Sequence, residues 1–272
     1  MILKHMLAGL VFISGTLAAT AALTRPHPQV GAGMTQTSRT PVVVELFTSE
    51  GCSSCPPADA LLVRLAEEQL DGNVQLIAME EHVDYWNDLG WVDPFSSRDW
   101  TMRQYVYAGA LGNGNAYTPQ MVVDGTTEFV GSHTKQAQEA ILKAASNAKI
   151  PVILERGKPN RADELDFLAK VGKLVGTGGG DAAEVWLAVT ETALHSAVKR
   201  GENAGEDLHH AAVVRSMRKI GEAKAGGETA FAGETRLLLQ KEWNRENLRA
   251  VLFVQEKKSR RILGAAEIRL AE

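Results

Sequence analysis

The order of apolar and polar residues divides the chain into two halves with different patterns. Val42 to Phe47 is a run rich in β-branched residues directly after a proline, and Val74 to Met79 is a second apolar run; both predict buried strands. The residues between them include ADALLVRLAEEQL, where apolar side chains recur at helical spacing. A strand, a helix and a strand in this order predict a β-α-β unit with parallel strands and a right-handed connection.

An aromatic segment at about residues 81–117 follows the second predicted strand. It holds all four tyrosines and three of the five tryptophans of the chain, and Ser97 to Ala108 within it has the pattern of a helix. Large aromatic side chains predict either the core of a helical insertion or a groove beside a functional site. In the second interpretation Trp86 and Tyr117 are candidate substrate contacts.

The next residues predict a hairpin and a helix. Gln120 to Val123 and Thr127 to Val130 are apolar enough for strands, and Asp124-Gly125 between them is a strong two-residue turn signal. His133 to Asn147 then has the spacing of an amphipathic helix. Pro119 just before the hairpin is either an ordinary proline at a strand start or a cis-proline held against a site.

From residue 151 onward the pattern changes to short alternating segments separated by glycine-rich turns. Eight such segments in about 120 residues predict an antiparallel β-sandwich of immunoglobulin-like size. They are residues 152–155, 164–175, 184–190, 193–199, 211–218, 235–240, 248–254 and 262–270. The sequence therefore predicts an α/β domain over residues 41–150 and an all-β sandwich over residues 151–272.

The first 40 residues have the character of an export signal and a leader. Residues 1–23 carry Lys4 and His5 near their start, then an apolar stretch and then small residues. This order predicts a cleaved signal peptide. The alternative is an uncleaved anchor, but Ser14, Gly15 and Thr16 leave a stretch shorter than the roughly 20 apolar residues of a membrane span. Residues 24–40 predict a flexible leader. We therefore expect a secreted or periplasmic protein with no membrane span in the mature chain.

Charge excludes one class of function. The formal net charge is −4, and the nearest basic cluster is the short EKKSRR stretch near the C-terminus, which is typical of a solvated hairpin tip. Nucleic-acid binding needs a basic face, so no nucleic-acid partner is expected.

The candidate chemistry lies in TSEGCSSCPPAD, which contains both cysteines of the chain, Cys52 and Cys55. Thiols at a helix start are acidified by the helix dipole and free N–H groups, so this motif favours redox chemistry. We expect Cys52, as the more exposed sulfur, to attack and Cys55 to resolve the mixed disulfide. A structural disulfide is one alternative, although so short a loop gains only about 2 kcal/mol. A copper site of Cys52, Cys55 and His82 is another, and His82 is otherwise a structural donor or a proton-transfer group.

These elements and motifs resemble a known family. The order of strand, C-x-x-C, helix, strand, Thr-Pro, hairpin and helix resembles the thioredoxin fold. The motifs FTSEGCSSCPPAD, HVDYWNDLGWVDPFSSR, RQYVYA, YTPQMVVDG and RGENAGEDLHHAAVVR are similar to an exported thioredoxin-like family known as domain of unknown function 1223. The resemblance covers nearly all of the chain after the signal segment. The family name carries no settled activity.

The resemblance implies roles for three further residues. Pro119 would be a cis-proline against the disulfide, and Thr118 would offer backbone hydrogen bonds to a bound peptide. Glu45 would accept a proton from Cys55, but it stands one residue further from Cys52 than the thioredoxin pattern. Because one residue turns a strand side chain to the opposite face, its role as proton acceptor and an ordinary acid on the strand both stay open.

Two functions follow from the sequence. The first is an exported thiol-disulfide oxidoreductase that acts on protein or peptide thiols, with a redox partner protein and no cofactor. The second is a non-catalytic exported binding protein in which C-x-x-C is a structural disulfide or a copper clasp. The RGENAGEDLHH stretch, residues 200–210, predicts a polar loop between strands, with ligand binding through His209 and His210 as the alternative.

Overall fold

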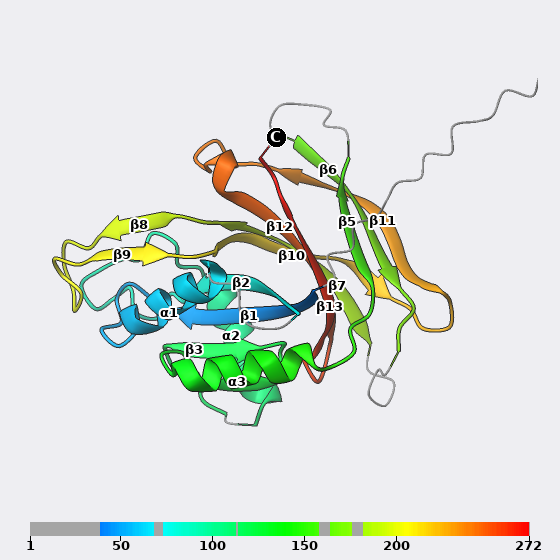
Figure 1. Cartoon of the computed structure of the whole chain (residues 1–272). Helices are drawn as coiled ribbons and strands as arrows, with labels where there is room; N and C mark the ends of the chain where they lie inside the picture. Colours follow the sequence, from blue (N-terminus) through cyan, green and yellow to red (C-terminus); the bar gives the residue numbers. More distant parts are fainter. Residues whose placement is uncertain (1–38, 68–72, 113, 158–163, 176–181, 272) are drawn as a thin grey trace, which may run out of the picture. The chain divides into compact units, whose positions relative to one another are not determined.

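A computed structural model describes residues 39–67, 73–112, 114–157, 164–175 and 182–271. The predicted signal peptide at 1–23 and nearly all of the predicted leader lie outside the described residues. The described strands form an eight-stranded sheet, a three-stranded sheet and a two-stranded hairpin (Figure 1). The order in the large sheet is β13-β12-β7-β10-β2-β1-β3-β4. No helix among these residues is both long and apolar enough to cross a membrane.

The predicted β-α-β unit is present in the large sheet. β1 (Thr40–Thr48) and β2 (Val74–His82) are parallel, and α1 (Pro56–Glu67) begins directly after the second cysteine. Two prolines open α1, where a helix has no N–H bond to lose. The even-numbered apolar residues of β1 pack with Leu61, Leu62 and Leu65 of α1, so the opposite face of β1 is free for other contacts.

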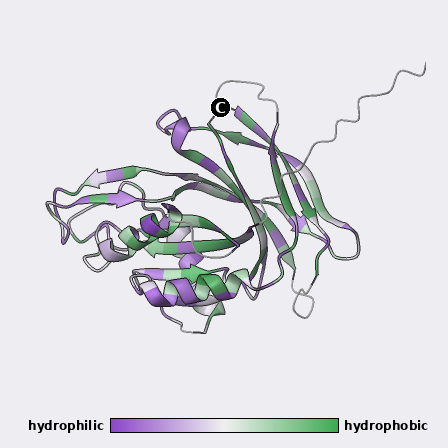
Figure 2. Cartoon of the chain, viewed as in Figure 1, coloured by the Kyte–Doolittle hydropathy of each residue, from purple (hydrophilic) through white to green (hydrophobic). Residues whose placement is uncertain are grey.

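The segments on either side of the predicted hairpin also fold as helices. α2 (Arg98–Ala110) begins at Ser97, whose hydroxyl accepts a hydrogen bond from the N–H of Asp99. β3 (Gln120–Val123) pairs antiparallel with β1 and with β4 (Thr127–Val130). α3 (Thr134–Ala145) packs Ala137, Ala140, Ile141 and Ala144 against the same core as α1. Figure 2 shows hydrophilic and hydrophobic residues alternating along α3, whereas β1 is mainly hydrophobic.

The prediction of an α/β thioredoxin-like domain followed by a separate β-sandwich is wrong. β10 (Val213–Ala223) pairs in parallel with β2 through Val213 and Glu80, and the N–H of Glu80 donates to the carbonyl of Ala212 at 2.8 Å. Strands from both halves of the chain therefore form one mixed sheet. The physical reason is that β2 would otherwise end in an open edge of unpaired backbone groups, part of which β10 pairs at Glu80.

A shared core also joins the two halves. One buried cluster holds Val43, Ile77 and Met79 from the first half, together with Ala188, Val251 and Phe253 from the second. Their strands β7 (Ala183–Glu191), β12 (Leu248–Glu256) and β13 (Ile262–Arg269) lie on the far side of β10 in the sheet. Residues 38–272 accordingly behave as one compact unit.

The three-stranded sheet covers another part of this core. β5 (Val152–Arg156), β6 (Glu164–Gly172) and β11 (Thr229–Leu238) pair antiparallel in the order β11-β6-β5. Their inward residues, including Leu154, Phe167 and Leu237, pack with Val185 and Leu252 of the large sheet. Sheets packed face to face are thus present, but one of them continues into the strands of the first half.

The third group of strands is a hairpin beside α1. β8 (Leu194–Ala197) and β9 (Asp207–His210) are antiparallel, and the hairpin lies alongside α1 (Figure 1). β9 was predicted as a polar loop. Its position brings residues 198–210 to the helix start where the cysteines lie.

Candidate functional site

Cys52 and Cys55 form a disulfide at the start of α1. The chain turns tightly here, with the N–H of Cys55 bonded to the carbonyl of Cys52 at 3.1 Å. The first N–H groups of the helix belong to Ala58 and Asp59, and both bond to the carbonyl of Cys55, at 2.8 Å and 3.2 Å. Because these two N–H groups already have a partner, it is the helix dipole that favours a thiolate at the helix start.

Thr118 and Trp86 lie against the first cysteine. The Thr118 hydroxyl donates to Cys52 Sγ at 3.3 Å, and Trp86 Nε1 donates to the same hydroxyl at 2.9 Å. The Thr118-Pro119 peptide bond is cis. The backbone at Gly51 also touches Trp86, because a Cβ added there would lie 3.0 Å from Trp86 Cβ. The structure thus brings Cys52, Thr118 and Trp86 together.

A loop from the second half of the chain covers the disulfide. The Asn203 side-chain amide donates to the carbonyls of Glu50 and Cys52, at 2.8 Å and 3.0 Å. Glu202 accepts a hydrogen bond from the N–H of Ser53 at 3.2 Å. We call residues 198–206 the cover loop. This stretch therefore packs on the cysteine turn, while ligand binding through His209 and His210 stays a prediction.

The expectation that Cys52 is the more exposed cysteine is wrong. Both cysteines have an exposed fraction of 0%. The cause is the cover loop together with Trp86 and Thr118, none of which is near the cysteines in the sequence.

Glu45 lies away from the disulfide face of β1. Its carboxylate accepts hydrogen bonds from Arg103 Nε at 2.5 Å and from the Tyr107 hydroxyl. Glu45 alternates with Val44 and Leu46, whose side chains face α1, so the extra residue of spacing turns it to the opposite face. Glu81 joins the group at 3.4 Å from Arg103 Nε, and burial, with Glu45 second, raises the pKa of Glu81 well above its usual range.

His82 belongs to a buried group of histidines and carboxylates beneath the cysteine loop. Its Nδ1 lies 2.7 Å from Asp93, and its Nε2 lies 3.4 Å from Glu80. His210 of β9 lies 2.7 Å from the same Glu80 and 3.2 Å from Glu50, two residues before Cys52. All five side chains are at most 2% exposed. Of the three residues of the predicted copper site, the structure places His82 in this buried group. The other two, Cys52 and Cys55, are bonded to each other as a disulfide.

Charges within this group change the pKa values of its members. Burial acts to lower the pKa of His210, but the carboxylates of Glu80 and Glu50 together outweigh it, and the pKa rises to about 9. For His82 the burial is likewise outweighed by Asp93, which raises the pKa well above its usual range. Glu80 shows the complementary effect: burial would raise its pKa, but His210 lowers it to about 2.

Asp59 is a further buried acid close to the cysteines. It stands one helical turn after Cys55 and accepts a hydrogen bond from the Thr48 hydroxyl at 2.6 Å. Its other oxygen has no hydrogen-bond partner among the described residues. Burial, assisted by the negative charge of Glu80, raises the pKa of Asp59 from 3.8 to about 7.

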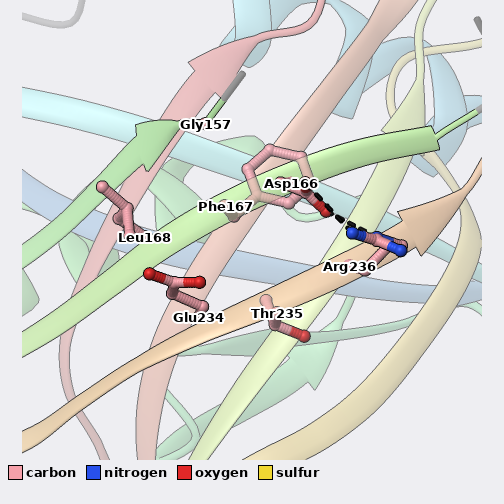
Figure 3. Close-up of a pocket in the computed structure, with 7 residues that line it drawn as sticks. All are labelled: Gly157, Asp166, Phe167, Leu168, Glu234, Thr235 and Arg236. Atoms are coloured by element: carbon pink, nitrogen blue, oxygen red, sulfur yellow. Dashed lines mark hydrogen bonds and ion pairs between the residues drawn. The ribbon is translucent and has the colours of Figure 1, made fainter. Parts of the chain in front are cut away.

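Tyr117 makes its side-chain hydrogen bond with a residue of β4. Its hydroxyl donates to Glu128 of β4, and burial followed by this hydrogen bond raises the tyrosine pKa. A hollow of about 420 Å³ lies elsewhere, over β6 and β11, where Arg236 Nε pairs with Asp166 at 2.7 Å (Figure 3). No cysteine or histidine lines this hollow, so it is separate from the disulfide site.

Sequence reasoning missed Asn203 and Asp59, and it paired His210 with His209 and not with Glu80. The available signals were Asp59 within the cysteine motif and the mixture of asparagine, acids and histidines in RGENAGEDLHH. That composition is typical of surface loops, so it did not distinguish a loop in solvent from one packed on the cysteines.

The fold and the site define a β-rich protein with one mixed sheet and a buried disulfide at a helix start. The profile of a family described as a protein of unknown function, DUF1223, matches residues 43–255, and the chain belongs to this family. The family resemblance seen in the sequence is confirmed.

Two solved structures are similar. One is a structural-genomics protein from Agrobacterium tumefaciens, with 26% identity, a TM-score of 0.61, and 86% of this chain and 96% of that chain covered. The other is HBP35 of Porphyromonas gingivalis, with 16% identity, a TM-score of 0.62, and coverage of 85% and 76%. The second likeness shows the fold alone. No curated protein matches the chain.

Proposed function

We propose that this protein is an exported thiol-disulfide oxidoreductase that exchanges disulfides with thiols of exported proteins or peptides through Cys52 and Cys55. The observation that carries the proposal is the disulfide between the two cysteines of the chain at the start of α1, with the Thr118 hydroxyl on Cys52 Sγ. A disulfide in so short a loop contributes little stability, so redox exchange is the better reason for it.

The exchange proceeds in two displacements. A substrate thiolate attacks Cys52 Sγ, the bond to Cys55 breaks, and its electron pair goes to Cys55 as a thiolate favoured by the α1 dipole. A second substrate thiolate then attacks the substrate sulfur of the mixed disulfide and releases Cys52. The substrate loses two electrons and two protons, and Cys52 and Cys55 gain them; reduction of a substrate disulfide is the reverse.

Both sulfurs are buried, so a substrate thiol reaches Cys52 only when the cover loop, Trp86 or Thr118 moves. The Asn203 and Glu202 hydrogen bonds to the cysteine turn are the contacts that opening would break. The same burial favours the second candidate function, a non-catalytic exported binding protein in which the disulfide is a closed structural bridge.

One experiment distinguishes these functions. The mature protein is titrated against glutathione to obtain the Cys52/Cys55 potential and is assayed for insulin reduction and for oxidation of a reduced peptide. We expect Cys52→Ser to abolish exchange and Cys55→Ser to retain exported proteins as mixed disulfides. Ser53→Ala should stay active, because it keeps both cysteines and changes an exposed side chain. The structural bridge would be supported instead by two results together. The wild-type protein would neither reduce insulin nor oxidise the peptide, and the Cys55→Ser variant would retain no protein.

A further inference from the structure

Two buried histidines point at one carboxylate oxygen. His210 Nδ1 lies 2.7 Å and His82 Nε2 lies 3.4 Å from Glu80 Oε1. One ligand atom of each of these three residues lies within 4.8 Å of the other two. Ligands on a tetrahedral ion with bonds of about 2.0–2.1 Å stand about 3.3 Å apart, so small side-chain shifts bring the three atoms around one ion.

Each histidine is held from behind by a second carboxylate. Asp93 lies 2.7 Å from His82 Nδ1, and Glu50 lies 3.2 Å from His210 Nε2. This arrangement, with one ring nitrogen on a carboxylate and the other aimed at a common point, is the one that orients metal-ligating histidines.

The outer carboxylates are themselves fixed by hydrogen bonds. Asp93 accepts from the N–H of Glu50 at 2.9 Å, and Glu50 accepts from Trp91 Nε1 at 2.7 Å. The second oxygen of Glu80 accepts from the N–H of Ala211 at 2.8 Å, which leaves Oε1 for the histidines. The group is thus preorganised by contacts from four separate segments of the chain.

His82 Nε2 is the unexplained atom of this group. It is buried, and it makes no hydrogen bond among the described residues. Its contact with Glu80 Oε1 at 3.4 Å lacks hydrogen-bond geometry, and a metal ion bound to this nitrogen would give it a closer partner.

Charge favours a divalent cation at this place. Three buried carboxylates, on Glu50, Glu80 and Asp93, surround two imidazoles. A divalent ion on neutral imidazoles supplies the same two positive charges as protonating both rings, so it also balances these carboxylates.

From these contacts we propose that Glu80, His82 and His210 bind a divalent first-row transition ion, with zinc the best fit to two imidazoles and one carboxylate. A cavity of about 400 Å³ that is lined by parts of α1, β2, β9, β12 and β13 has His210 among its lining residues. The site contains neither cysteine, so it is independent of the proposed redox function.

The test uses the full mature chain in its oxidised form. The protein is treated with a chelator, dialysed, and titrated with Zn²⁺ by equilibrium dialysis; Co²⁺ then serves as a spectroscopic probe. We expect about one ion per chain. Asp93→Asn should weaken binding about 10- to 100-fold, and His82→Gln should weaken it more than that, since it removes a ligand and not its support.

The control addresses an exposed histidine pair on the same hairpin. His195 and His209 stack with ring centroids 5.6 Å apart, and both lie 3.1–3.5 Å from Asp207. The double variant His195→Gln, His209→Gln should bind Zn²⁺ as the wild type does. Loss of binding in this variant, or no bound Zn²⁺ in the wild type at micromolar free ion, would overturn the proposal.

A second measurement covers the case in which His82→Gln does not fold. X-ray absorption of the Co²⁺-loaded wild type should show two imidazoles, oxygen ligands and no sulfur. Sulfur ligation would instead assign the ion to Cys52 and Cys55. The Cys52→Ser, Cys55→Ser double variant should keep its affinity for Zn²⁺ even if the oxidoreductase proposal fails.

Discussion

The side-chain amide of Asn203 donates to the main-chain carbonyl of Cys52 at 3.0 Å, across 151 positions of sequence. This bond and its companion to the Glu50 carbonyl connect the cover loop to the disulfide turn. The second half of the chain therefore contributes contacts to the turn that carries Cys52.

Asn203→Asp should make the disulfide easier to reduce. The aspartate cannot donate, and it sets a carboxylate against the carbonyls of Glu50 and Cys52. Because a lost buried hydrogen bond costs about 1–3 kcal/mol, we expect reduction by dithiothreitol to be about tenfold faster or more. The measurement is thiol alkylation over time. Glu202→Gln in the same loop keeps an acceptor oxygen and should change the rate little; equal rates for Asn203→Asp and wild type would show that the loop does not limit access.

Asp59 should make stability depend on pH. Its pKa is about 7 in the folded chain against 3.8 for the ordinary group, so its contribution is fully present below 3.8 and is lost as pH rises toward 7. Within that window the free energy of unfolding should lose about 1.4 kcal/mol per pH unit through this group. The asparagine of the variant Asp59→Asn resembles the protonated acid, so the free energy of unfolding of this variant should fall less with pH. Urea unfolding at several pH values measures this. Asp99→Asn, at an exposed position in α2, should leave the wild-type slope; the same slope in Asp59→Asn would contradict the prediction.

Arg103 should be a major contributor to stability on the other face of the sheet. It is the cation beside Glu45 and Glu81, and its guanidinium also reaches Gln255 of β12 at 3.3 Å. Arg103→Met leaves two buried carboxylates without this partner, and we expect a loss of about 3–5 kcal/mol in chemical unfolding. Arg98→Met, an exposed arginine of the same helix, should cost no more than about 0.5 kcal/mol. Similar losses in both variants would contradict this account.

Gly125 should not tolerate a side chain. Its φ is +67°, and an added Cβ would lie 1.9 Å from the carbonyl oxygen of Arg260, so the β3–β4 turn and residues 257–261 would have to separate. Gly125→Ala should therefore lower the unfolding free energy by more than about 1 kcal/mol. Gly109→Ala in α2 meets no atom within 4 Å and should raise it by about 1 kcal/mol, since alanine favours helix. Thermal unfolding of both variants tests the contrast.

Local patterns predicted much of the first half of the fold. The β-branched run of β1, the helical spacing of α1 and the turn at Asp124-Gly125 each depend on neighbours in sequence, and each was found where predicted. Most strands of the second half were also predicted, although β9 was not. Their partners were not predictable, because the pairing of β10 with β2 joins residues more than 100 positions apart and leaves no periodic signal.

The candidate site divides in the same way. By itself, the sequence determined the family, the two cysteines at a helix start and the Thr118-Pro119 pair, because these are short motifs with local geometry. Only the tertiary structure decided that the cysteines are buried, that Glu45 turns away to Arg103, and that His82 meets His210 through Glu80. The physical reason is that strand facing, sheet order and loop packing are set by burial between distant segments, which no stretch of sequence records alone.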